Sequence, residues 1–152
     1  MAIDKAEWQY DSAMKEYCEA TGKKQEELTS ADEDTIWEYA GNHIAFFITW
    51  LIRRDLLGDF HHEDDEEGKD LREVKEQKET GMYILRKYCD MVLTDEDISE
   101  DILGFVEDYY ENQYLNDFGT AMDGKILCVS FSWDDYLKVE PLIDAAYSGE
   151  LI

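Results

Sequence analysis

The chain has 152 residues, and its 38 Asp and Glu residues against 14 Lys and Arg residues give a formal net charge of -24. So acidic a surface argues against direct binding of nucleic acid or of an anionic membrane. Hydrophobic residues make up 44% and aromatic residues 13% of the chain, which excludes a disordered protein and predicts a single domain over residues 1–152.

The cysteines and the N-terminus indicate where such a protein works. Cys18, Cys89 and Cys128 are odd in number and far apart, so neither a disulfide framework nor a zinc site is predicted, and we expect reduced, mostly buried thiols. The N-terminal segment has no apolar region of the secretory type. The most apolar run, HIAFFITWLI, is about half as long as a membrane span. We therefore expect a cytoplasmic protein without a membrane segment.

The first predicted element is an amphipathic helix over residues 4–20. Trp8, Met14 and Tyr17 alternate there with charged residues at helical spacing. Gly22 is suited to end this helix.

The second predicted helix covers residues 32–57 and begins at a capping box formed by Ser30 and Glu33. It is apolar on almost every side, which predicts a buried central helix. His43 projects from an apolar side, so we expect a packed, hydrogen-bonded core histidine rather than a catalytic one.

The middle of the chain is more polar. Residues 58–70, GDFHHEDDEEGKD, predict an exposed loop that leads into a charged helix over residues 69–79. A short apolar helix is predicted within residues 80–93. Thr94 and Asp97 then have the spacing of an N-terminal cap.

That cap introduces a helix predicted over residues 99–112, which separates aromatic from acidic side chains. Its apolar arc contains Ile102, Leu103, Phe105, Val106, Tyr109 and Tyr110. From Tyr88 to Gly124 there are eleven acidic residues and no basic one, so no pairing within this segment weakens the negative field. Tyr114 and Phe118, beyond the predicted end of the helix, are expected to be exposed anchors. The predicted partner-binding residues are Glu100, Asp101, Glu107, Asp108, Glu111, Tyr114 and Asp117.

The last part of the chain predicts a strand and a helix. The strand is expected within residues 123–131, DGKILCVSF, with its partner elsewhere in the chain or in another molecule. Ser132 and Asp135 have cap spacing before a final helix, which Pro141 is expected to delay or kink. The predicted fold is mainly α with a minor strand component, a single compact helical domain around its buried central helix.

No pattern in the sequence indicates catalysis or a cofactor. Gly-rich phosphate loops and the G-x-S-x-G motif are missing from the sequence. Carboxylate pairs are plentiful in so acidic a chain, so a general acid and base cannot be identified. The adjacent His61 and His62 do not share a helix face, and one metal ion would need further ligands from elsewhere. We predict no enzyme, no cofactor and no metal site.

Three segments resemble a known group of proteins: HIAFFITWLI, the stretch from Lys78 to Phe118, and SFSWDDYLKVEPLIDAAY. They are similar to a family of small acidic bacterial proteins that resembles the immunity proteins of polymorphic toxin systems. The matching residues are Trp8, His43, Gly81, Cys89, Asp90, Leu93 to Asp97, Tyr109, Tyr110, Tyr114, Leu115, Asp117, Trp133 and Tyr136. The resemblance implies a protector that binds and inhibits a cognate toxin.

Three functions are weighed on these grounds. The leading prediction is a non-enzymatic acidic inhibitor that neutralises a basic toxin domain, such as a nuclease, by electrostatic and shape complementarity. The alternative is a metal- or small-molecule-binding protein that uses His43, His61 and His62. A third possibility is an acidic protein from a salt-rich setting without a cationic partner. The oligomeric state is left open.

Overall fold

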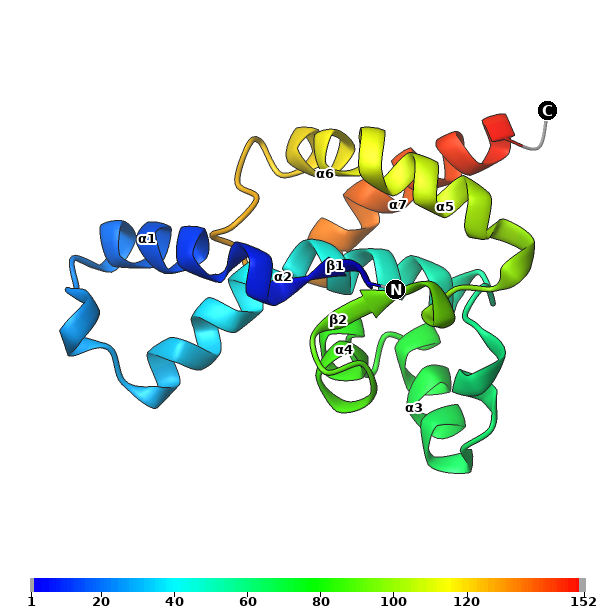
Figure 1. The fold of residues 1–152 in the computed structure, drawn as a ribbon, viewed down its shortest axis with the longest axis horizontal. Helices are drawn as coiled ribbons and strands as arrows, with labels where there is room; N and C mark the ends of the chain where they lie inside the picture. The colour runs from blue at the N-terminus through cyan, green and yellow to red at the C-terminus, as the bar shows by residue number, and fades with distance from the viewer. Residues whose placement is uncertain (1, 151–152) are drawn as a thin grey trace.

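The centre of the fold is α2 (Ser30–Arg53), a 24-residue helix around which the other elements pack in the computed structural model, which describes residues 2–150 (Figure 1). Its capping box is formed by Thr29 and Asp32, one residue before the predicted pair: Asp32 N donates to Thr29 Oγ1 at 3.2 Å, and Thr29 N donates to Asp32 Oδ2 at 2.8 Å. Every residue from 40 to 52 is buried. The prediction of a buried central helix is confirmed.

The N-terminal segment is only partly the predicted helix. Residues Ala2–Lys5 form strand β1, a 3₁₀ turn follows, and α1 covers Tyr10–Thr21. α1 runs antiparallel beside the first half of α2 (Figure 1). It ends at Gly22, whose φ of 74° is the left-handed conformation expected of a helix stop.

Helices α3 (Asp65–Lys75) and α4 (Gly81–Tyr88) cover one side of α2. The chain then forms β2 (Val92–Thr94), which pairs antiparallel with β1 so that Asp4 lies opposite Leu93. This two-stranded sheet is the whole strand component of the described residues apart from an isolated bridge.

The predicted strand within residues 123–131 is wrong. Those residues form turns and irregular backbone between α6 (Leu115–Ala121) and α7 (Trp133–Glu150). Their apolar side chains, such as Ile126 and Phe131, pack against the core without a strand partner. Cys128 in this segment is free and half-buried, as are Cys18 and Cys89, so the thiols are less buried than expected.

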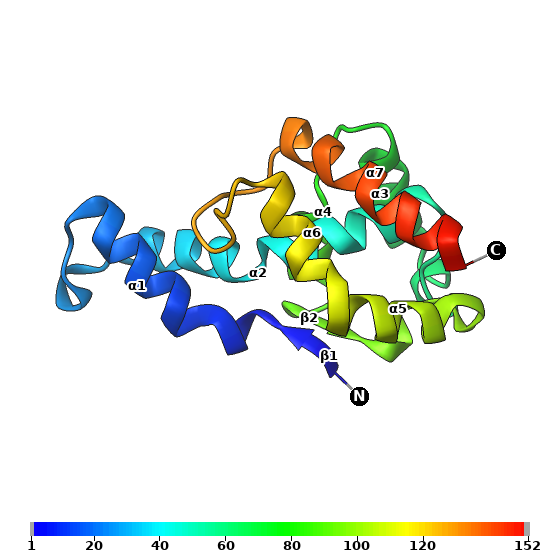
Figure 2. The ribbon, with the colours of Figure 1, turned by 90° about the horizontal axis from the view of Figure 1, so that it is seen from above.

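The other side of α2 is covered by α5 (Leu103–Tyr109), a π-helical turn (Tyr110–Tyr114), α6 and α7 (Figures 1 and 2). The predicted helix over 99–112 therefore begins with a 3₁₀ turn at Glu100–Ile102 and continues nine residues further. α7 begins after Ser132, as the cap spacing predicts, so Pro141, which lies inside the helix, does not delay its start. The fold is mainly α with a small two-stranded sheet, as predicted.

Candidate partner-binding surface

Two segments distant in sequence form a surface rich in carboxylates. We call it the acidic face. It flanks two adjoining grooves, of about 600 Å³ and about 500 Å³, that share Asp95 at their boundary. No Lys or Arg is among the described residues that line either groove. Asp95 is half-buried, and the exposed carboxylates of the face are Asp59, Glu63, Glu96, Glu100, Asp101, Glu107 and Glu111.

The two segments are held together by their backbones. Gly58 N donates to Asp97 O at 2.9 Å, and Ser99 N donates to Leu56 O at 2.9 Å. A Cβ atom at position 58 would lie 2.1 Å from Glu96 O, so only glycine permits this approach. The acidic residues that follow Gly58 and those that surround Asp97 are thereby brought to one groove.

An aromatic side chain stands within the larger groove. Phe60 is 40% exposed, and its ring packs against the buried ring of His61 with 4.0 Å between centroids. Large apolar side chains surrounded by charge are typical anchors of protein interfaces, where they supply most of the buried apolar area. Phe60 therefore offers the acidic face an apolar contact point.

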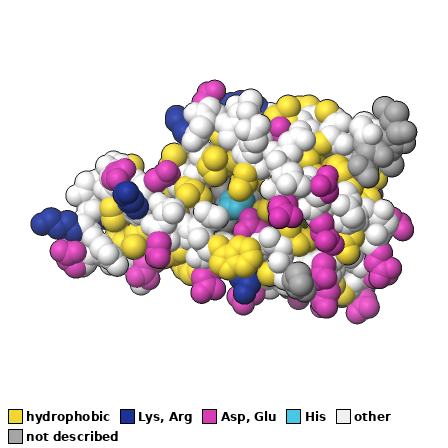
Figure 3. Space-filling view, turned by 45° about the horizontal axis from the view of Figure 1, so that its top comes forward, with side chains coloured by type: hydrophobic (Ala, Val, Ile, Leu, Met, Phe, Trp, Pro, Cys, Tyr) yellow, Lys and Arg dark blue, Asp and Glu magenta, His cyan; other side chains and the backbone are white. Residues whose placement is uncertain are grey.

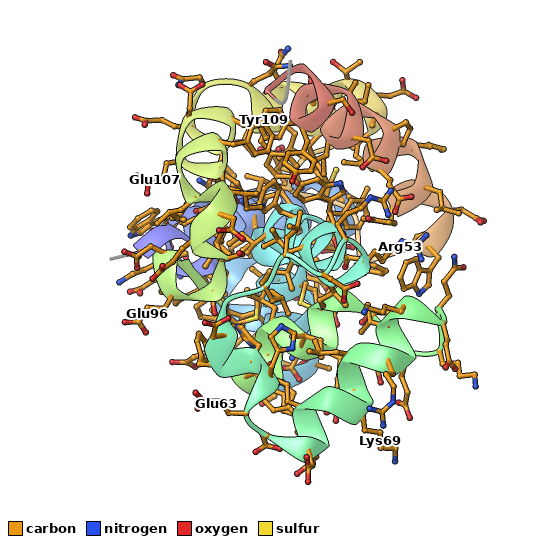
Figure 4. All side chains as sticks on the ribbon, turned by 90° about the vertical axis from the view of Figure 1, so that its right-hand side faces the viewer. Arg53, Glu63, Lys69, Glu96, Glu107 and Tyr109 are labelled. Carbon is orange, nitrogen blue, oxygen red and sulfur yellow. The ribbon has the colours of Figure 1, made fainter. Side chains whose placement is uncertain are left out.

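Three carboxylates of this face lie on the side of the molecule opposite Arg53 and Lys69. Figure 4 shows Glu63, Glu96 and Glu107 along one side, whereas Arg53 and Lys69 lie on the other. In Figure 3, carboxylate side chains gather over one end of the molecule without Lys or Arg among them.

Elsewhere on the surface, cations neutralise carboxylates directly. Arg54 pairs with Asp144 at 2.7 Å, and Arg53 pairs with Glu140 at 2.7 Å. Other pairs join α3 to α4 and the loop after α1 to α2. Within residues 2–150, no such pair with Lys or Arg is formed by the seven exposed carboxylates of the acidic face.

The structure divides the seven predicted partner-binding residues into three groups. Glu100 and Asp101 line the larger groove, and Glu107 and Glu111 line the smaller one. The remaining three residues are elsewhere.

Asp108, Asp117 and Tyr114 do not belong to the acidic face. Asp108 lies on the side toward α7, where it accepts a hydrogen bond from Asn112 Nδ2 at 3.0 Å. Asp117 accepts a hydrogen bond from Tyr109 OH at 2.7 Å. The expectation that Tyr114 and Phe118 are exposed anchors is wrong, because the helix continues to Ala121 and carries both side chains into the core, where each is fully buried.

A buried hydrogen-bond network orients the helical segment that bears Glu107 and Glu111. Tyr110 OH donates to Asp4 Oδ2 at 2.6 Å, and His43 Nε2 lies 2.8 Å from the same oxygen. Burial by itself raises the pKa of Asp4, because it disfavours the charged carboxylate. The hydrogen bonds from His43, Tyr110 and the Lys5 backbone, together with the charge of His43, outweigh burial and lower the pKa of Asp4. Tyr114 OH donates to His43 O at 2.5 Å. His43 is therefore the hydrogen-bonded core histidine that was predicted, and it joins β1 to the helix that bears Glu107 and Glu111.

The three histidines do not form the alternative site. Whereas His43 contacts Asp4, His61 is buried between Glu67 and Asp97, and His62 is exposed. The prediction of an exposed loop around His61 is wrong, because residues 59–62 form a 3₁₀ turn and α3 begins at Asp65. The two carboxylate partners satisfy the ring nitrogens of His61 and permit its burial.

Sequence reasoning missed part of the acidic face. Asp59, Phe60, Glu63 and Glu96 were not selected, although two acidic runs, HHEDDEE and LTDED, are visible in the sequence. No periodicity within either run indicates that the two meet in space. Their contact depends on the tight backbone approach at Gly58.

Comparison with known proteins gives one family match. A family model described as a domain of unknown function, DUF7832, matches residues 2–130. No curated protein and no solved structure matches the chain. Within the described residues, no helix combines the length and apolarity needed to cross a bilayer.

Proposed function

The chain belongs to the DUF7832 family of domains of unknown function, and from its own surface we propose that it is a non-enzymatic cytoplasmic inhibitor that binds a basic protein. The partner class we propose is a cognate toxin domain. The observation that carries this proposal is the acidic face, in which exposed carboxylates surround two grooves that no Lys or Arg lines.

Charge and shape both support a protein partner. A patch of one sign accelerates encounter with an oppositely charged protein and disfavours wrong partners. The grooves offer concave space for the long side chains of Lys and Arg, and Phe60 offers an apolar anchor beside them. The charge, the grooves and Phe60 all act by contact with a partner, and none of them requires catalysis by this chain.

A toxin that acts on nucleic acid fits this chemistry. Its active surface must be basic, because DNA carries one negative charge per about 1.7 Å of helix axis. A row of exposed carboxylates occupies such a surface by imitating the phosphates. The resemblance to immunity proteins points to the same class of partner.

The proposal is tested by capture followed by kinetics. The tagged chain is used to isolate partners from lysate of cells that express its genomic neighbours, and the captured protein is purified. Its association rate is then measured with the wild-type chain and with a Glu100→Lys/Glu107→Lys variant. We expect one basic protein, whose association rate falls about tenfold or more in the variant and falls steeply with salt.

A second variant, Glu19→Lys/Glu26→Lys, is the matched control. These two residues are also exposed but lie at the far end of the molecule, in α1 and the turn after it, and the change in net charge is the same. If both variants bind the partner as fast as the wild type, the acidic face is not the binding surface.

A further inference from the structure

Four chemically distinctive side chains meet behind the acidic face. His61 is fully buried, and Glu67 and Asp97 are each only 3% exposed. His61 Nε2 lies 2.8 Å from Asp97 Oδ1, and His61 Nδ1 is hydrogen-bonded to Glu67 Oε2. Cys89 Sγ lies 3.8 Å from the same Asp97 Oδ1. The side chains of His61, Glu67 and Asp97 come from three different helical elements and Cys89 follows the end of α4, so their convergence is a product of the fold.

We propose that His61, Cys89 and Asp97 bind one divalent transition-metal ion of the zinc class. One ligand atom from each of the three residues lies within 4.8 Å of the other two. Tetrahedral zinc holds nitrogen at about 2.0 Å and sulfur at about 2.3 Å, so its ligand atoms are about 3.3–3.8 Å apart. The more distant ligand atoms must approach by up to about an ångström, whereas His61 Nε2 and Asp97 Oδ1, now 2.8 Å apart, must separate by about half an ångström. The ion then replaces the direct hydrogen bond between His61 and Asp97. The fourth position of the ion is left for water.

The ligands are already oriented as metal ligands are. His61 presents Nε2 to the site because its other ring nitrogen is occupied by Glu67, which is the carboxylate–histidine arrangement common around zinc. Asp97 presents Oδ1 because its Oδ2 accepts hydrogen bonds from Thr94 N at 2.7 Å and from Thr94 Oγ1 at 3.2 Å. The outer partners thus fix both side chains before any ion arrives.

The charges of this cluster favour a cation. Two buried carboxylates share a single imidazole, so even a protonated His61 leaves one negative charge without a partner in the cluster. Burial of an uncompensated charge costs several kcal/mol. When a divalent ion binds, the protons of the Cys89 thiol and of His61 Nε2 are released to solvent, and the ion then contacts the Asp97 carboxylate directly in place of the imidazolium. The combination of thiolate, imidazole and carboxylate favours zinc and its transition-metal neighbours over magnesium or calcium, which prefer oxygen ligands alone.

The ion would join the two segments that carry the acidic face. The backbone oxygen of Asp97 accepts a hydrogen bond from Gly58 N. His61 is the residue after Phe60, and Phe60 lines the larger groove. The metal site is independent of the proposed inhibitor function, because its evidence is the buried cluster and not the exposed carboxylates.

The test uses the full chain, stripped of metal with a chelator and titrated with Co²⁺ and then with Zn²⁺. We expect one tightly bound Co²⁺ per chain, with a near-ultraviolet thiolate-to-cobalt charge-transfer band that Zn²⁺ abolishes by displacement. Ions bound loosely to surface carboxylates give no such band. Both ions should raise the melting temperature, because binding to the folded state stabilises it.

Variants locate the site. Cys89→Ser should remove the charge-transfer band, whereas Cys18→Ser, which changes another half-buried thiol, should keep it. His61→Asn should abolish tight binding, and His62→Asn, on the exposed neighbour, should not. Glu67→Gln should weaken affinity about 10- to 100-fold.

The proposal is overturned by a wild-type chain that shows neither the band nor a melting shift at excess metal. This holds even if the Cys89 or His61 variant does not fold. A band that persists in Cys89→Ser, or that Cys18→Ser removes, also overturns it.

Discussion

Asp4 is a buried carboxylate that accepts hydrogen bonds from residues of two different helices. Tyr110 OH and His43 Nε2 both approach its Oδ2, and the Lys5 backbone N donates to its Oδ1 at 2.8 Å. An ionised group in the core is tolerated only when its oxygens are satisfied in this way. The hydroxyl of Tyr110 therefore contributes stability as well as orientation.

Replacement of Tyr110 by Phe removes one donor and leaves the ring in place. We expect the free energy of unfolding to fall by about 1–3 kcal/mol, because Asp4 stays buried with one fewer hydrogen bond. Urea denaturation measures the change. Tyr147→Phe is the control, since that half-buried ring also packs on aromatic neighbours but its hydroxyl has no hydrogen-bond partner among residues 2–150. Equal stability of the two variants would contradict the role given to Asp4.

At the scale of elements, close backbone approach sets the arrangement of the helices. Gly81, at the start of α4, faces α2: an added Cβ would lie 1.9 Å from Thr49 Oγ1 and 2.5 Å from Ala45 O. A larger residue at position 81 must push α4 away from the central helix. Gly58 has the same role between the segments of the acidic face.

Gly81→Ala should lower the free energy of unfolding by about 1–3 kcal/mol or more, since the new methyl group overpacks the contact between α2 and α4. Gly104→Ala is the matched control in another helix. No atom lies within 4 Å of a Cβ at position 104, so that substitution should raise stability by about 0.5–1 kcal/mol. Thermal or chemical denaturation distinguishes the two, and a Gly81→Ala chain as stable as wild type would show that the helices separate at little cost.

Elements with strong local signals were predictable from the sequence. The central helix follows from its apolar run, and Gly22 ends α1 as a left-handed stop should. The predicted end at residue 112 is too early, although Tyr110, Tyr114 and Phe118 recur every fourth residue and continue the apolar stripe of the helix as far as Ala121. This error alone placed Tyr114 and Phe118 on the surface. The strand error has a similar cause, since a short apolar run does not reveal whether a partner strand exists.

Contacts between distant segments were not predictable. The larger groove and the cluster around His61 both depend on residues 58–67 meeting residues 94–101. Composition indicates that each segment is acidic, but pairing is decided by backbone geometry at Gly58 and by the hydrogen bonds of Asp97. A single sequence contains no local signal for either.

At the scale of the whole molecule, the net charge of -24 opposes folding. Ion pairs compensate some carboxylates, such as Asp144 with Arg54, but no Lys or Arg is among the described residues that line the grooves of the acidic face. Like charges on one surface repel one another, and dissolved salt screens that repulsion. The loss of folding free energy caused by this repulsion is therefore sensitive to ionic strength.

The melting temperature should rise with NaCl between about 0.01 M and about 1 M, over which the screening length falls from about 30 Å to about 3 Å. Each kcal/mol of repulsion relieved corresponds to about 2–4 °C. The Glu100→Lys/Glu107→Lys variant should melt higher at low salt and respond less to added salt. A melting temperature that is flat or falls for the wild type would mean that the repulsion is already compensated.

The pairing of β1 with β2 and the hydrogen bond between Asp4 and Tyr110 also determine when this fold can form during synthesis. The hydrogen bond joins residues 106 positions apart. At about 5–20 residues per second, a ribosome needs roughly 5–20 s to add the missing partner. During that interval α2 exists with much of its apolar surface uncovered, so the growing chain is exposed to aggregation and to chaperones until its tyrosine-rich helix has emerged.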